Sequence, residues 1–424
     1  MAIIQVRINI DNFIAKVLTF LVIVYPLLSV YGINQINLGM VSMFLFILVI
    51  ILTIRKIEMK WPKYFWMFFV YMVFSRFFSS ENYAISSLFS MNLFSFAIII
   101  GFSFKYFNLP LGLKIYEISV LICCFFFFLQ ELMYFTLGTR IVGLLPWIPL
   151  NTGMASSDYI SWLRYNSRSA SFFLEPAHFA QFIIPLLALE LFKTQKTKMT
   201  IFYILVISVV ILLLKSGTGI LVVTFIYIIY FFYYTRNSKL YNKLILIFIL
   251  LPGIIIGTFT YLKSEMGKEL TDRKSEFSEI SSTTSAYVRI IRGFDLYADI
   301  PVSYKYFGLN SPTKIKAYIS MSSMSFLFLE DDLSFSCIQS ILIYGGFIGM
   351  LIFLIHFSYL FNNNEIEGRM LAVAFIGLSI ISPIYLMGEM ILCYTIMYSY
   401  QKYYIKKEDC IISTNFIALE HKNL

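Results

Sequence analysis

A polar stretch that enters an apolar segment carries the residues best suited to chemistry. Arg164 and Arg168 precede Glu175, and Pro176 follows that carboxylate directly. Proline disfavours helical geometry in the residue before it and suits the first turn of a helix, so we expect Glu175 at the start of a helix. A carboxylate held there, a few residues from an arginine, is placed to move a proton beside a bound phosphate. The same residues also suit a helix cap with a surface ion pair.

A second pair of arginines lies in residues 283–297. If this segment is helical, Arg289 and Arg292 share one face because they are three residues apart. Two guanidinium groups on one face suit a diphosphate, since their forked donors match phosphate oxygens and never lose their charge. The alternative is that Asp295 and Asp299, on the same face, pair with the arginines.

Five further positions complete the predicted site. His178 lies one turn into the helix that follows the first arginine pair, where it either assists the reaction or is an ordinary interfacial histidine. Ser216 and Thr218 open another predicted helix, and the simpler interpretation is a tight turn between two helices. Gly308 and Asn310 belong to a turn in which a glycine lets the backbone approach a ligand closely.

The composition is that of an integral membrane protein. Of 424 residues, 59% are hydrophobic and only 13% are charged, and the mean hydropathy is +0.78; soluble domains contain about 25% charged residues. The net charge of +9 does not indicate nucleic acid, because most basic residues lie in short loops between apolar segments. The five cysteines and three histidines show no spacing typical of a metal site or disulfide framework. We therefore expect no metal and no cofactor.

Apolar segments predict about twelve membrane-spanning helices, since each span needs roughly 20 mostly apolar residues. The predicted spans begin near Phe13, Ile36, Trp61, Ala84, Ile115, Ala177, Met199, Gly217, Asn242, Phe335, Arg369 and Gly388. No internal repeat or separate soluble domain is evident. The expected fold class is therefore an all-α polytopic membrane protein, with residues 1–424 forming a single membrane domain.

The basic residues predict the orientation of these spans. With a cytoplasmic N-terminus, the predicted inside loops are rich in lysine and arginine, whereas the short outside loops at residues 31–35 and 79–83 contain neither. An even number of spans places both termini in the cytoplasm. Two long loops, at about residues 138–171 and 263–334, then lie outside, and loops of such length are usually functional. Both arginine pairs belong to these loops.

Four motifs taken together resemble the O-antigen polymerase (Wzy-type) family, within the larger group that includes the O-antigen ligases. They are residues 168–176, residues 216–219, residues 285–292 followed by the turn at 307–310, and Ser336 followed by Gly346 and Gly349. The resemblance covers about residues 138–350, through order, spacing and topology. The first five spans match only in being hydrophobic.

This resemblance implies a GT-C-like architecture and a glycosyltransferase that joins undecaprenyl-diphosphate-linked repeat units of O-antigen or capsule-type glycan. The reaction would occur at the periplasmic face of the bacterial inner membrane, with inversion and without a metal. Cationic side chains must then stabilise the leaving diphosphate. In this interpretation Arg168, Arg289, Arg292 and also Arg164 bind diphosphate, and Glu175 is the general base or orients an arginine. The expected partners are these lipid-linked glycans, membrane lipid and a chain-length regulator, and no nucleic acid.

Two alternatives stay open. An O-antigen ligase would transfer finished glycan to lipid A core during lipopolysaccharide assembly. Ligases of this group typically have histidine before the serine of the last motif, whereas this chain has Phe335, which favours the polymerase. A polysaccharide flippase would place charges at the bilayer midplane and often shows repeats or broken helices, whereas the distinctive charges of this chain lie in the predicted outer loops.

Overall fold

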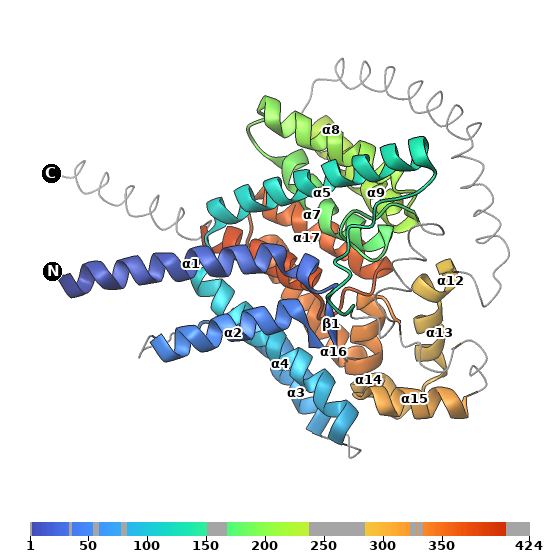
Figure 1. Ribbon diagram of the computed structural model, residues 1–424. Coiled ribbons are helices and arrows are strands. Elements are labelled where there is room, and N and C mark those ends of the chain that lie inside the picture. The colour runs from blue at the N-terminus through green and yellow to red at the C-terminus, as the bar shows by residue number, and fades with distance from the viewer. Residues whose placement is uncertain are drawn as a thin grey trace.

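Helices dominate the structure (Figure 1). An apolar segment in lipid must satisfy its backbone donors and acceptors internally, which a helix does. The computed structural model describes residues 2–33, 36–53, 59–77, 83–150, 168–236, 285–322, 328 and 334–403.

A helix lies at each predicted span except the ninth, which was expected near Asn242 and falls outside the described residues. The first five are α1 (Ala2–Leu28), α2 (Leu38–Thr53), α3 (Lys63–Phe77), α4 (Tyr83–Tyr106) and α5 (Leu109–Leu137). The later ones are α7 (Pro176–Phe192), α8 (Lys198–Leu213), α9 (Gly217–Arg236), α16 (Cys337–Asn362), α17 (Ile366–Ile381) and residues 388–403. The second long loop contributes α12 (Ser285–Ile290), α13 (Arg292–Asp299), α14 (Val302–Phe307) and α15 (Pro312–Met321).

Four helices of the described chain are long and apolar enough to cross a membrane. They are residues Asp11–Leu28 of α1 and the helices α5, α9 and α16. Shorter apolar helices occur in α2, α3, α4, α7 and α8. The architecture is therefore compatible with an all-α membrane protein, and the count of twelve spans and their orientation stay predictions.

Helix α7 is the most buried helix around which its neighbours pack. Almost all of its residues are buried, and α5, α8, α9 and α17 lie against it. Pro176 occupies its first turn, where the missing N–H removes no helical hydrogen bond. Glu175 caps the helix with extended backbone, at φ −134° and ψ 151°, as the proline predicts. The buried helix thus fixes the backbone of Glu175 at its N-terminal end.

Two short strands depart from the all-helical expectation. Strands β1 (Gly32–Ile33) and β2 (Ile36–Asn37) pair antiparallel between α1 and α2. The Tyr31 hydroxyl accepts a hydrogen bond from the Leu145 backbone N–H at 3.0 Å. The described start of the first long loop, residues 138–150, is therefore fastened to the end of α1.

The turn that contains Gly308 packs closely against α16. Gly308 and Gly346 both have positive φ, at 78° and 66°, and Gly346 interrupts the helical geometry of α16. A Cβ added to Gly308 would lie 2.3 Å from the carbonyl oxygen of Tyr344, so only glycine fits without a shift of the backbone. The Leu309 N–H donates to the Ile343 carbonyl at 2.8 Å. We call this contact the glycine crossing.

Candidate functional site

Glu175 and Arg289 meet in the structure, although 114 residues separate them in the chain. Arg289 Nη2 lies 3.4 Å from Glu175 Oε2. The first long loop and the cap of α7 supply the carboxylate, and α12 of the second long loop supplies the guanidinium group. Their side chains are 50% and 35% exposed, so a ligand in water can reach both. The structure therefore brings together one predicted residue from each long loop.

His178 lies beside this ion pair, in the first turn of α7. Its backbone N–H donates to the Glu175 carbonyl at 3.1 Å, and its partly buried side chain is within electrostatic range of both Glu175 and Arg289. We call these three residues the Glu175 cluster. A carboxylate, an imidazole and a guanidinium group in one place suit proton transfer next to an anion.

Arg168 precedes Glu175 in the first long loop and is hydrogen-bonded to the turn between α8 and α9. Its Nη1 donates to the Lys215 carbonyl at 2.7 Å. Ser216 caps α9, since its hydroxyl accepts from the Gly219 N–H at 3.4 Å, and Thr218 is buried in the first turn. Ser216 and Thr218 thus occupy the helix–helix turn that was the simpler interpretation of their sequence, and Arg168 is attached to it.

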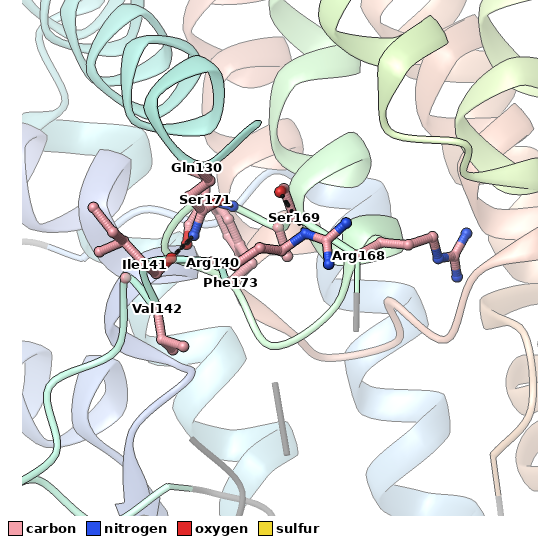
Figure 2. A pocket seen from close by; sticks show the side chains of 10 residues that line it. Gln130, Arg140, Ile141, Val142, Arg168, Ser169, Ser171 and Phe173 are labelled. Carbon is pink, nitrogen blue, oxygen red and sulfur yellow. Dashed lines mark hydrogen bonds between the residues drawn. The ribbon is translucent and has the colours of Figure 1, made fainter. Parts of the chain in front are cut away.

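Arg168 also lines a small, shallow cleft between the first long loop and α5 (Figure 2). Arg140 lies in this cleft, where its Nε donates to Ser169 Oγ at 3.2 Å and its guanidinium carbon lies 3.6 Å from the Tyr134 ring centroid. In Figure 2 the Arg140 side chain reaches Ser169, while the Arg168 side chain extends away from Gln130. The lining residues are Gln130, Arg140, Ile141, Val142, Gly143, Arg168, Ser169, Ala170, Ser171 and Phe173.

Gln130 of α5 holds the two sides of this cleft together (Figure 2). Its Oε1 accepts from the Ser171 N–H at 2.8 Å, and its Nε2 donates to the Ile141 carbonyl at 2.7 Å. Ser171 has a positive φ of 56°, and its hydroxyl donates to the Cys123 carbonyl at 2.8 Å. These bonds fix the loop that leads from Arg168 to α7.

Sequence reasoning missed Arg140 and Gln130. Arg140 is a basic residue in a loop predicted to lie outside, against the usual charge bias, and this signal was available. Gln130 is a lone amide in an apolar helix, where one polar residue does not indicate a specific partner.

Arg292 does not share an open face with Arg289. Helix α12 ends at Ile290 and α13 begins at Arg292, whose side chain is only 2% exposed. Its Nη2 donates to the Ser334 carbonyl at 3.0 Å, and its guanidinium carbon lies 4.7 Å from the Phe328 ring centroid. The prediction that Arg289 and Arg292 share one open face is therefore wrong. Arg292 points into the protein and anchors α13 near the start of α16.

The carboxylates of α13 bind tyrosines. The Tyr287 hydroxyl donates to Asp295 Oδ2 at 2.7 Å, and the Tyr318 hydroxyl donates to Asp299 Oδ2 at 3.1 Å. Burial, together with the Asp295 carboxylate, raises the pKa of Tyr287 to about 12. Among the described residues, the ion pair of Arg289 is with Glu175, so the expected alternative of an Arg289 pair with these carboxylates does not occur.

The start of α16 positions Arg289. The Gln339 side chain donates to the Ile290 carbonyl at 2.8 Å and also forms a capping box with Ser336. A Cβ on Gly293 would lie 2.6 Å from the Gln339 side chain, so α13 approaches α16 closely. Gln339 therefore ties the end of α12, one residue beyond Arg289, to the bundle.

Two predicted ligand-binding positions lie elsewhere. Gly308 and the buried Asn310, with a φ of 61°, belong to the glycine crossing with α16. Arg164 lies outside the described residues. Within the described part of the chain, no group of three or more His, Cys, Asp or Glu is arranged to hold a metal ion.

Comparison with family models and with curated proteins finds no match for this chain. The described geometry is a partly exposed carboxylate and guanidinium group at one end of an apolar bundle, with two more arginines in the adjoining loop. Guanidinium groups of this kind suit an anionic ligand.

Proposed function

We propose that the chain is an integral membrane glycosyltransferase that polymerises undecaprenyl-diphosphate-linked repeat units at the periplasmic face of the bacterial inner membrane. The 3.4 Å contact between Arg289 and Glu175 carries the proposal. The substrate has a tail that requires lipid, a diphosphate that requires cations and a sugar hydroxyl that requires a base. The ends of apolar helices beside the Glu175 cluster offer all three environments.

In the proposed reaction, Glu175 accepts the proton of an acceptor hydroxyl as that oxygen bonds to the anomeric carbon of the donor glycan. The bond between this carbon and the diphosphate oxygen breaks on the opposite face, so the configuration inverts. Undecaprenyl diphosphate leaves with the electron pair, and guanidinium groups stabilise its developing charge.

The resting ion pair fits this sequence of events. An exposed pair of this kind contributes only about 0–1 kcal/mol to stability, so Arg289 can move from Glu175 to a diphosphate oxygen at little cost. Binding of the donor would then release the carboxylate to act as a base. Arg140 and Arg168 add positive charge in the adjoining loop and attract the anionic substrate.

The test is Arg289→Ala in a strain whose surface glycan depends on this chain, with Arg236→Ala at the exposed end of α9 as a matched control. We expect Arg289→Ala to abolish long-chain glycan and leave single repeat units on lipid A core, and the control to keep the normal ladder. Normal long chains with Arg289→Ala would reject the proposal. A core without any glycan would instead identify a ligase.

Activity of the purified protein separates an enzyme from a transporter. In detergent, with lipid-linked repeat units and no gradient, a polymerase forms longer lipid-linked chains and releases undecaprenyl diphosphate. If the wild-type chain forms no product there, yet moves the same lipid across vesicles, the function is transport.

A further inference from the structure

Helix α14 has no buried residue, and its side chains at positions 302, 304, 306 and 307 are apolar or aromatic and exposed. Val302, Tyr306 and Phe307 are 67%, 53% and 57% exposed, and Met321 at the end of α15 is 86% exposed. Exposed apolar side chains concentrated in so short a segment indicate contact with a second apolar partner or phase.

The place of α14 along α16 identifies this phase. No residue at 337–346 of α16 is exposed, but exposed apolar side chains recur at helical spacing after the glycine crossing, at Phe347, Leu351 and Leu354. A stripe of this type is expected where a helix faces lipid. Phe307 directly precedes Gly308, which contacts Gly346, so the patch of α14 continues the lipid-facing stripe at its outer edge.

The length of α16 places the membrane boundary at the same level. The two helical parts of α16, on either side of Gly346, together contain 26 residues and extend at most about 39 Å, which is about 9 Å more than the hydrocarbon core of a bilayer. If the Asn362 end of α16 lies at the cytoplasmic boundary, roughly the first six residues of α16 extend beyond the hydrocarbon core at the other end. The outer boundary then falls near Ile343, whose carbonyl accepts from Leu309.

The charge of this segment fits a lipid surface. Residues 300–322 contain Lys305, Lys314 and Lys316, and no Asp or Glu. The same segment contains three tyrosines and one phenylalanine. Tyrosine and lysine are typical of segments that lie at a membrane–water interface, where the cations meet anionic headgroups.

We propose that residues 300–322, which we call the lysine–aromatic arm, lie in the headgroup region of the outer leaflet and bind its anionic lipids. Val302, Tyr306 and Phe307 enter the acyl-chain boundary, and Lys314 and Lys316 lie among the headgroups, whereas Lys305 Nζ donates to the Ala298 carbonyl at 2.6 Å. Helix α15 packs against α4, and Figure 1 shows α12 to α15 gathered on the side of the bundle opposite the N-terminus. The proposal does not depend on the chemistry at Glu175.

The test uses the full chain in vesicles of phosphatidylethanolamine and phosphatidylglycerol, with one spin label in a Cys410→Ser background. The chain's other four cysteines are buried, so they are protected from the reagent. Labels at Phe307→Cys and Val302→Cys are compared with Phe125→Cys, an exposed position on α5, and with Ala298→Cys at the exposed end of α13. Collision rates with oxygen and with a water-soluble nickel chelate report depth.

We expect the oxygen-to-nickel ratio at positions 302 and 307 to be several-fold above that at 298 and below that at 125. A ratio equal to that at 298 would place the arm in water and overturn the proposal. Low collision rates with both reagents would mean that protein, a second copy or a partner, covers the patch, which also overturns it. Replacing phosphatidylglycerol by phosphatidylcholine should reduce the depth, and Lys314→Gln/Lys316→Gln should remove that lipid dependence; an unchanged dependence would reject anionic recognition.

Discussion

Two ionic clusters lie at opposite ends of α7 and differ in burial. At the N-terminal end, Glu175 and Arg289 are 3.4 Å apart, and both are substantially exposed. Just beyond the C-terminal end, Lys193 Nζ lies 2.9 Å from Glu190 Oε1 and 3.3 Å from Glu117 Oε1, and the Glu190 side chain is only 3% exposed. The first is the ion pair of the Glu175 cluster, which we call the outer cluster in this comparison. We call the second group the inner cluster.

The difference indicates what each cluster contributes. An exposed, long ion pair adds about 0–1 kcal/mol to stability, so the outer cluster is not needed to hold the fold. A buried carboxylate that loses its partner costs about 3–5 kcal/mol, so the inner cluster ties α7 to α5. One buried helix thus has a structural cluster at one end and an adaptable one at the other.

The largest expected effect comes from Glu175→Gln. Loss of the proposed base should lower the polymerisation rate by about 10²–10⁴-fold, while the free energy of unfolding changes by at most about 1 kcal/mol. Rates on lipid-linked repeat units and thermal unfolding in detergent check both parts. If the rate falls only together with the folded fraction, Glu175 has a structural role and the contrast between the clusters disappears.

The inner cluster should show the opposite pattern. Lys193→Gln removes the ammonium group that bonds the Glu190 carboxylate, while Lys196 stays within electrostatic range of it, so the variant should destabilise the fold by about 1–3 kcal/mol, with little change in rate per folded molecule. Lys198→Gln, one position past the helix cap of α8, is the matched control. Equal unfolding midpoints for these two variants would show that the inner cluster is not structural.

Gly308→Ala tests the close backbone approach at the glycine crossing, which lies away from both clusters. The new Cβ would lie 2.3 Å from the Tyr344 carbonyl oxygen, so the backbone must shift, and alanine also pays the cost of a positive φ. The two effects together should destabilise the fold by more than about 2 kcal/mol. Gly138→Ala is the control, because Gly138 has a similar φ of 67° and open space around it. It should cost only about 1–2 kcal/mol. Equal losses in thermal unfolding would contradict a close approach at Gly308.

Alkaline pH should weaken the inner cluster before the rest of the fold changes. Burial lowers the pKa of Lys193, but Glu190 and Glu117 raise it by more, so the net pKa lies above its ordinary value of 10.5. A raised pKa gives stability that is complete below 10.5 and is lost as pH rises through the folded-state pKa. The difference in unfolding midpoint between wild type and Lys193→Gln should therefore be constant near neutral pH and shrink above 10.5. A difference that shrinks already at neutral pH would exclude this titration.

Much of the outer cluster could be predicted from local chemistry and topology. Pro176 fixes Glu175 at a helix start whatever the tertiary structure, and the predicted alternation of spans would place both long loops at one end of the bundle. These two facts suffice to bring Glu175 and Arg289 to the same end. The 3.4 Å contact itself depends on how α12 packs on α16 through Gln339.

Other features depend on contacts that no local pattern contains. Arg292 is buried because Phe328 and Ser334, far along the chain, receive it. A turn at Gly308 was expected from the sequence, but its positive φ and its close approach to the backbone at Gly346 were not, and ligand binding there stays a prediction. Helix positions follow from apolar length, whereas side-chain direction within a loop follows from tertiary packing.

The glycine crossing has a consequence for biosynthesis. Gly308 leaves the ribosome roughly 40 residues before Gly346, which at about 5–20 residues per second is a delay of several seconds. During this time α14 has no backbone partner on α16, and the Arg289 segment has no Gln339 to bind. The nascent chain therefore completes its outer cluster only after α16 has been inserted, so truncated translation products that end before Gly346 lack an assembled site.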